Sequence, residues 1–255
     1  MPVSLKIRLV GDPGKKHGSY LASMLHGALM EQIESRYVEK LHKSEIHPFS
    51  QYVTIQKDQI VWTVNCLTKE AEDIILSALE AKTFTSIYLS HRDETLFIQE
   101  KERKECSFPE LINDYYFGEK RNLLNIRFVS PTAFKSGGEY CIFPSIRLIF
   151  QSLMLKYDAC CEENHVFSEE ILAHYEKYAR IIRYRLRSVS FHMEGVHIPA
   201  FTGDVTIKIN GPQPMVNMAW MLAEFGTFSG IGIKTGLGMG GMEIMDGTDK
   251  KNGGR

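Results

Sequence analysis

The chain has 255 residues and a net charge of −1, with 44% hydrophobic and 24% charged residues. This is the composition of a globular protein, and the length predicts two domains of ordinary size. The small net charge excludes a strongly basic, histone-like binder, so any surface for nucleic acid must be a local patch. The five cysteines include no C-x-x-C pair, which argues against a disulfide framework and a zinc knuckle.

The segment MPVSLKIRLVGDPGKK (residues 1–16) contains an apolar run that is too short for the core of a signal peptide. Nowhere does the sequence approach the ~20 apolar residues that span a bilayer. Together with the odd number of cysteines, this predicts reduced thiols and a soluble, cytoplasmic protein without a membrane partner.

The first half of the chain shows the order strand, helix, two strands, helix, strand. Alternating apolar residues predict the strands, and apolar residues at helical spacing predict the helices. These elements are a strand over 5–10, a helix over 20–37, two strands within 47–67 around the turn QKDQ, a helix over 68–82 with Thr68 as N-cap, and further strand within 85–103. The order is that of a ferredoxin-like βαββαβ domain.

The second half repeats this order. It predicts strands over 123–130, 179–193, 200–211 and 240–246, with helices over 145–159 and 214–228. We therefore predict an α+β protein with two tandem ferredoxin-like (RRM-like) βαββαβ domains, one over residues 1–120 and one over 121–255. The last ten residues, DGTDKKNGGR, are expected to form a frayed tail.

The stretch SGIGIKTGLGMGG (229–241) contains six glycines. Gly236, Gly238 and Gly241 satisfy G-x-G-x-x-G, but this match follows a predicted helix instead of a strand, and too little chain follows it for the acidic residue of a dinucleotide site. The Walker pattern also fails because Ile233 precedes Lys234. Two interpretations remain: a hairpin that closes the sheet, or a loop whose N–H groups and Lys234 cradle the phosphates of a polymer.

Three segments carry a family resemblance: GIGIKTGLGMGG after the last helix, FVSPTAFKSGGEYCIFPS at the start of the second half, and PAFTGDVTIKINGP before that helix. With them the chain resembles the CRISPR repeat-RNA processing endoribonucleases of the RAMP superfamily over residues 3–246. The resemblance implies tandem ferredoxin-like domains that hold CRISPR repeat RNA, and cleavage of precursor CRISPR RNA within each repeat without a metal or cofactor. Homodimer formation and association with other proteins of a CRISPR interference complex stay open.

Metal-independent cleavage of RNA needs a base for the 2′-OH proton, an acid for the leaving 5′ oxygen, and positive groups around the phosphorane. It yields a 2′,3′-cyclic phosphate and a 5′-hydroxyl. Histidine suits both proton transfers because its unperturbed pKa is ~6.5.

The family pattern places the candidate catalytic residues. LHGALMEQI supplies His26 at the position on the first helix, and LHKSEIHPFS supplies His42 in the Leu-His step that follows. His47 stands where relatives often carry lysine, and Lys43 is an alternative for that electrostatic role. The spacing leaves open which of His26 and His42 is the base and which is the acid.

Two groups of residues are candidates for binding RNA. In the glycine stretch they are Lys234, Gly232, Gly236, Gly238 and Gly240. In the predicted strand over 179–193, Arg183, Arg185 and Arg187 alternate and therefore share one face, as a phosphate-binding stripe requires.

Two other functions compete with the nuclease. A non-cutting RNA-binding subunit of the same superfamily would keep the glycines and arginines but would need no pair of histidines. A nucleotide-binding metabolic enzyme would use the G-x-G-x-x-G match, and the order of the elements argues against it.

Overall fold

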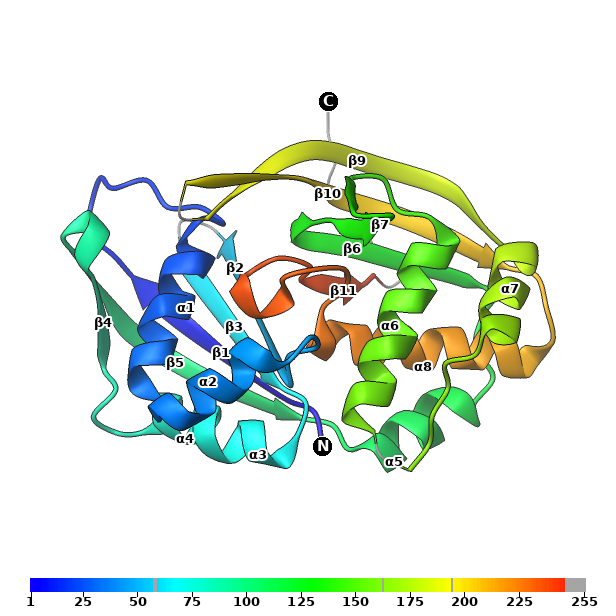
Figure 1. The fold of residues 1–255 in the computed structure, drawn as a ribbon, viewed down its shortest axis with the longest axis horizontal. Coiled ribbons are helices and arrows are strands. Elements are labelled where there is room, and N and C mark those ends of the chain that lie inside the picture. Colours follow the sequence, from blue (N-terminus) through cyan, green and yellow to red (C-terminus); the bar gives the residue numbers. More distant parts are fainter. Residues whose placement is uncertain (57–58, 162, 194, 246–255) are drawn as a thin grey trace.

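The computed structural model describes residues 1–56, 59–161, 163–193 and 195–245. Two antiparallel sheets lie side by side, each with helices packed against it (Figure 1). No helix in these ranges is long and apolar enough to cross a membrane. The predicted tail over 246–255 and part of the predicted QKDQ turn fall outside the described residues.

The N-terminal sheet has the strand order β2-β3-β1-β5-β4. Its strands are β1 (Val3–Val10), β2 (Phe49–Gln56), β3 (Gln59–Cys66), β4 (Ser86–Leu89) and β5 (Glu94–Glu105). Without the short edge strand β4, this is the antiparallel arrangement of a ferredoxin-like domain. The alternation in β1 buries Leu5, Ile7 and Leu9 beneath the helices.

The predicted helix over 20–37 forms, except for a break at residues 33–34. The structure has two helices, α1 (Leu21–Gln32) and α2 (Ser35–Lys43), separated where Ile33 adopts an extended conformation (φ −116°, ψ 158°). This break redirects the chain so that Leu25 and Leu29 of α1 and Leu41 of α2 are all buried in one core. The part of α2 beyond residue 37 was not predicted, because the polar residues of this helix outnumber its apolar ones.

The predicted helix over 68–82 forms with its N-cap, since the Thr68 side chain accepts a hydrogen bond from the Ala71 N–H (3.3 Å). It consists of α3 (Lys69–Ala71), the π-helical turn η1 (Glu72–Leu76) and α4 (Ser77–Glu80). The predicted strand within 85–103 is a hairpin of β4 and β5. These strands are joined by the 3₁₀ turn η2 (Ser90–Arg92) and by Asp93 in the left-handed region (φ 46°).

The C-terminal sheet has the strand order β11-β6-β10-β9, again ferredoxin-like. Its strands are β6 (Leu123–Thr132), β9 (Ala179–Met193), β10 (Val196–Ile209) and β11 (Met242–Ile244), and a separate hairpin holds β7 (Phe134–Ser136) and β8 (Glu139–Cys141). The helices are α6 (Ile146–Cys160), α7 (Glu169–Tyr178) and α8 (Gln213–Ser229). The sequence predicts α6 and α8 to within one residue, whereas α7 was not predicted.

Each sheet has its own apolar core, one containing Trp62 and the other Phe150 and Phe225. Helix α5 (Phe108–Leu111) and the turn η3 (Ile112–Tyr116) pack against the second core although they precede residue 120. The division into 1–120 and 121–255 stays a prediction, and this packing places the change of core before residue 108.

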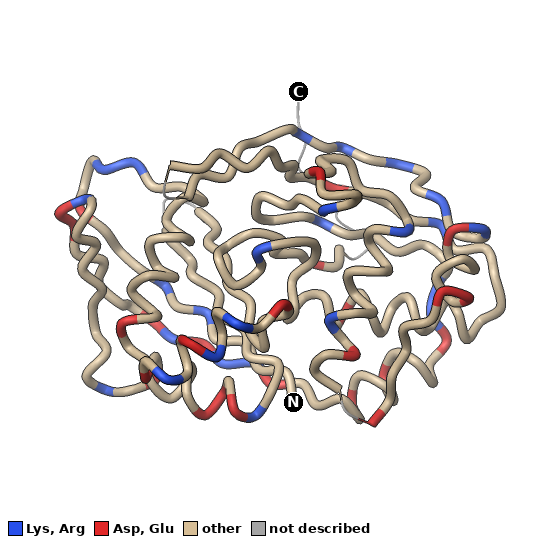
Figure 2. Tube along the Cα trace, in the orientation of Figure 1, with Lys and Arg blue, Asp and Glu red and all other residues tan. Residues whose placement is uncertain are grey.

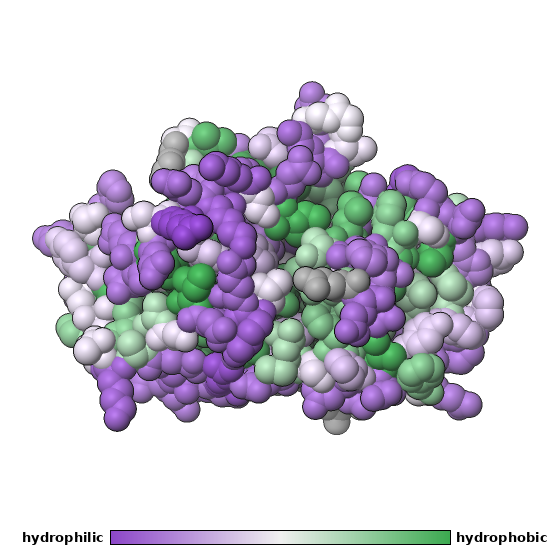
Figure 3. All heavy atoms as spheres, turned by 60° about the horizontal axis from the view of Figure 1, so that its bottom comes forward, coloured by the Kyte–Doolittle hydropathy of each residue, from purple (hydrophilic) through white to green (hydrophobic). Residues whose placement is uncertain are grey.

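The surface differs between the two halves. On the face drawn in Figure 3, hydrophilic residues cover much of the N-terminal half, whereas apolar residues show in several areas of the C-terminal half. Lys and Arg alternate with Asp and Glu over the N-terminal helices (Figure 2). This mixture agrees with the small net charge, so a basic surface has to be local.

Residues 230–241, called the glycine loop below, join the two halves. The loop runs from the end of α8 to β11 and lies between α1 and α6 (Figure 1). Buried Gln51 of β2 donates to the carbonyls of Ala22 (2.8 Å) and Gly236 (3.2 Å), and its own carbonyl accepts from Trp62 Nε1 (2.9 Å). A buried amide thus bonds to α1, to β3 and to the loop at once, which fixes their relative positions.

Glycine is required where the loop meets the N-terminal helix. Gly238 has φ 115°, and a Cβ there would lie 2.2 Å from the Cβ of Ala22. A Cβ at Gly236 would lie 2.8 Å from Nδ1 of His47. The loop backbone therefore approaches the N-terminal half more closely than any residue with a side chain would permit.

We predict that Gly238→Ala lowers the free energy of unfolding by about 2–4 kcal/mol, because it combines a left-handed φ with a clash. Gly14→Ala is the matched control. It also has a positive φ (88°) but nothing within 4 Å of its Cβ, so it should lose only about 1 kcal/mol. Urea unfolding measures both values, and equal losses would show that the contact with Ala22 is unimportant.

Candidate active site

His26 lies on the flank of α1, facing the glycine loop. Its half-buried ring stacks parallel to Phe49, with ring centroids 6.2 Å apart and planes 2° from parallel. The pKa of His26 is lowered to about 4, mainly by burial and to a smaller extent by the charges of His47 and His42, while hydrogen bonding to the Gly236 backbone opposes the shift. The imidazole is therefore neutral at pH 7.

His47 lies in the link between α2 and β2, on the same aromatic ring. Its centroid is 5.7 Å from that of Phe49, and its Nδ1 faces Gly236 of the loop. Burial lowers the pKa of His47, and the charges of His42 and Lys156 lower it further. Nδ1 of His47 and Nδ1 of His26 are both buried and have no hydrogen-bond partner among the described residues.

His42 is exposed in the last turn of α2, next to exposed Lys43. Its charge lowers the pKa of both His26 and His47, so all three imidazoles interact electrostatically. The structure thus brings His26 and His47 together on Phe49, where the charge of His42 acts on both, and these three residues are called the histidine cluster below. It places Lys43 at the exposed margin of this cluster.

Two of the predicted RNA-binding glycines use their N–H groups inside the protein. The Gly232 N–H donates to Ser152 Oγ (2.8 Å) and the Gly240 N–H to the carbonyl of Pro131 (2.9 Å). Gly236 and Gly238 pack against the N-terminal half instead. The RNA contacts of these four glycines stay predictions, and those of Gly232 and Gly240 would have to be made without the N–H.

Lys234 occupies a left-handed turn, with φ 54° and ψ 36°. Its carbonyl accepts from the N–H groups of Leu237 (3.0 Å) and Met239 (3.3 Å), which closes the turn. A positive φ is unfavourable for lysine, and such strain tends to occur at functional sites. Its predicted contact with a phosphate stays a prediction.

Lys156 of α6 is a charged residue beneath the glycine loop that the sequence reasoning missed. Its buried ammonium group donates to the carbonyls of Ser229 (3.3 Å) and Gly230 (3.3 Å) and to Thr235 Oγ1 (3.0 Å). Burial lowers the pKa of Lys156 to about 7. In the sequence, Lys156 stands between Leu153 and Tyr157, beside the apolar stripe of a predicted core helix. A lysine in that position was the signal that could have revealed it.

The three arginines lie on β9, the edge strand of the C-terminal sheet. Arg183, Arg185 and Arg187 are exposed, and the strand contains no acidic residue (Figure 2). Leu186, which points to the other face, packs against the second core. The structure thus confirms the strand and the exposure of its arginines, whereas their binding of RNA stays a prediction.

The described residues also bear on two other kinds of site. They contain no group of three His, Cys, Asp or Glu residues that could hold a metal ion. The G-x-G-x-x-G match lies after helix α8 and leads into β11, so it lacks the strand-to-helix turn of a dinucleotide site.

Comparisons with known proteins identify the family. A family model described as CRISPR-associated endoribonuclease Cas6 matches residues 126–242. The Cas6 endoribonuclease of Streptococcus thermophilus is 36% identical over 230 residues, which cover 90% of this chain and 93% of that protein. The chain belongs to the Cas6 family of endoribonucleases. Cas6 of Mycobacterium tuberculosis H37Rv is 30% identical over 225 residues, 88% of this chain and 71% of that protein.

Solved Cas6 structures share the fold. A Cas6 product complex has a TM-score of 0.77 at 24% identity, covering 96% of this chain and all of that one (100%). Cas6 of Thermus thermophilus has a TM-score of 0.76 at 22% identity, covering 96% and 98%. The predicted family and the tandem ferredoxin-like fold are confirmed.

The low pKa of His26 predicts a pH-dependent stability. The unfolded chain, with a histidine pKa of ~6.5, binds more protons than the folded chain at pH values between that value and about 4. His26 therefore stabilises the folded protein fully above pH 6.5, and this contribution is lost as the pH falls. The free energy of unfolding should decrease by about 2 kcal/mol between pH 7 and 4.5 for this reason.

Urea unfolding at the two pH values should show a smaller loss in His26→Gln than in the unsubstituted protein. His165→Gln, at an exposed histidine, is the control and should keep the original loss. An unchanged loss in His26→Gln would mean that His26 titrates normally in the folded protein.

Proposed function

We propose that this Cas6 protein cleaves precursor CRISPR RNA within its repeats by a metal-independent reaction of the 2′-OH. The 2′ oxygen forms a bond to phosphorus while the bond from phosphorus to the 5′ oxygen breaks. One proton leaves the 2′-OH for a base, and another reaches the 5′ oxygen from an acid. The products are a 2′,3′-cyclic phosphate and a 5′-hydroxyl.

The observation that carries this proposal is the histidine cluster. His26 and His47, which come from separate segments, lie against one ring beside the glycine loop, and the charge of His42 acts on both. His42 is exposed, as a group that exchanges protons with substrate must be, and His26 is its partner in the second proton transfer. A bound phosphate would raise the pKa of neutral His26 and His47, since a nearby negative charge favours the protonated form.

Positive groups around the cluster supply the remaining chemistry. His47, once protonated, and Lys43 would stabilise the charge of the phosphorane. Lys234 and the glycine loop would hold the strand beside the cluster, and Arg183, Arg185 and Arg187 would bind a more distant part of the phosphate backbone. Structures of similar Cas6 proteins include a product complex and a substrate mimic complex, which supports repeat RNA as the ligand.

We predict that His42→Ala slows single-turnover cleavage of repeat RNA by about 10²- to 10⁴-fold in EDTA, the usual range for loss of an acid or base. Its affinity for the RNA should change little, because the phosphate-binding cations remain. His165→Ala, which removes an exposed histidine outside the cluster, should cut at the original rate.

Three outcomes would contradict this mechanism. An unchanged rate in His42→Ala would remove this residue from the chemical step. Loss of cleavage in EDTA that Mg²⁺ restores in that step would replace the metal-independent reaction. Tight binding of repeat RNA without any cleavage by the unsubstituted protein would leave the RNA-binding subunit as its function.

A further inference from the structure

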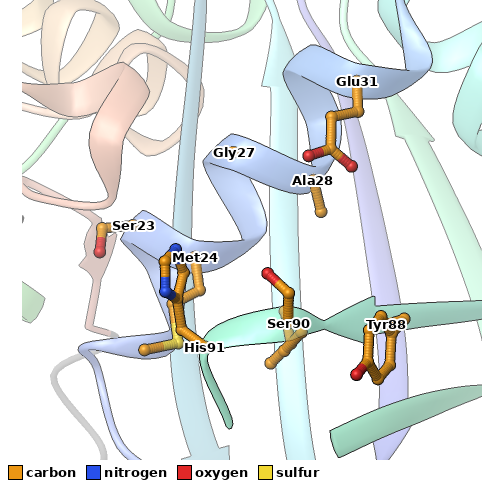
Figure 4. A pocket seen from close by; sticks show the side chains of 9 residues that line it. Ser23, Met24, Gly27, Ala28, Glu31, Tyr88, Ser90 and His91 are labelled. Atoms are coloured by element: carbon orange, nitrogen blue, oxygen red, sulfur yellow. The ribbon is translucent and has the colours of Figure 1, made fainter. Parts of the chain in front are cut away.

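A cavity of about 310 Å³ lies between α1 and the end of β4, outside the histidine cluster. Figure 4 shows residues of α1, among them Met24, Ala28 and Glu31, facing Tyr88 and Ser90 of the opposite strand and turn. His91 stands at one end of the cavity, near Met24. The cavity is large enough for one nucleobase and is open to solvent.

Gly27 lines this cavity from the middle of α1. Glycine is unfavourable inside a helix, so its presence there calls for a reason. Packing within the chain gives none, because a Cβ at Gly27 would meet nothing within 4 Å. In the other long helix with an interior glycine, α8, a Cβ at Gly226 would lie 2.7 Å from Leu153. The absence of a side chain at Gly27 therefore leaves room for another molecule to approach the backbone of α1 closely.

The cavity and the histidine cluster share helix α1. His26 directly precedes Gly27 and points to the other flank of the helix, toward the glycine loop. An RNA strand with a phosphate at His26 could cross the bare backbone at Gly27 and place a later base in the cavity. A side chain at position 27 would stand in that path.

The lining suits a base better than a phosphate. Tyr88 is 61% exposed, and its hydroxyl holds the ring in place by donating to Asp93 Oδ1 (3.0 Å), so the ring can stack on a base. The Glu31 carboxylate can accept from an amino group of a base but would repel a phosphate. Cations lie beyond His91, where Lys15 donates to the carbonyls of Arg92 (3.2 Å) and Asp93 (2.8 Å).

We propose that this cavity binds one nucleobase of the RNA strand, a few nucleotides from the cleaved phosphate. This subsite rests on the proposed function, because it takes the strand from the histidine cluster. Gly27 keeps the crossing open, Tyr88 stacks on the base, and Glu31 and Ser90 contact its polar edge.

The decisive variant is Gly27→Gln, which fills the cavity with a helix-favouring side chain. Its melting temperature should rise by about 2–4 °C, because glycine is replaced inside a helix. Its affinity for fluorescein-labelled repeat RNA, made uncleavable by a 2′-deoxy substitution at the cut, should fall roughly 5- to 100-fold. Ser77→Gln, on the exposed side of α4, is the matched control and should leave affinity unchanged.

Single abasic nucleotides placed in turn along the same RNA identify the occupant. One position should weaken binding to the unsubstituted protein but not to Gly27→Gln, because the variant has already lost that contact. Equal affinity of Gly27→Gln and unsubstituted protein, or equal effects of every abasic position on both, would overturn the subsite.

The two proposals fail in different ways. If the unsubstituted protein cleaves repeat RNA and Gly27→Gln binds and cleaves equally well, the subsite alone is wrong. The unsubstituted protein could instead bind RNA, with one abasic position weakening its binding but not that of Gly27→Gln, and yet never cut the RNA. In that case the nuclease mechanism is wrong and the subsite stands. The subsite would also be overturned if the protein bound no RNA, or if the cavity bound a protein ligand in preference to RNA.

Discussion

The close packing of the glycine loop against α1 and β2 is the contact on which the candidate site depends. The loop leads from α8 into the C-terminal sheet, yet its Gly236 lies against His47 and its Gly238 against Ala22. Gln51 bonds the same loop to α1. The absence of side chains at these glycines lets the two halves meet within van der Waals distance, so the surroundings of the histidines are assembled from both halves.

This contact also sets the electrostatics of the site. Burial lowers the pKa of both His26 and His47 in the free protein. When it is protonated, the Lys156 amino group beneath the loop uses its three donors on Ser229, Gly230 and Thr235, which leaves it no donor for RNA. The charge of Lys156 lowers the pKa of His47. A phosphate that enters such a site meets imidazoles that become protonated as it binds, and this is favourable for stabilising a developing negative charge.

The sequence allowed the order of strands and helices along the chain, the capped helix at Thr68 and the positions of α6 and α8 to be predicted, because these follow from local periodicity. The break at Ile33 depends on tertiary burial of Leu41 and left no local signal. The family pattern pointed to His26, His42 and His47, and it also contains Phe49, but it did not show that Phe49 packs against both His26 and His47, and it did not point to Lys156. The glycines were recognised as permissive, whereas their contact with Ala22 required the folded chain, because it joins residues more than two hundred positions apart.

NMR titration of the imidazole resonances tests most directly whether the loop creates the site. The account predicts a midpoint near pH 4 for His26 and one below ~6.5 for His47. In Gly236→Ala, where the new methyl group would displace His47, both midpoints should move toward ~6.5 as water reaches the rings. A midpoint near 6.5 for His26 in the unsubstituted protein, or midpoints that Gly236→Ala leaves in place, would contradict the account.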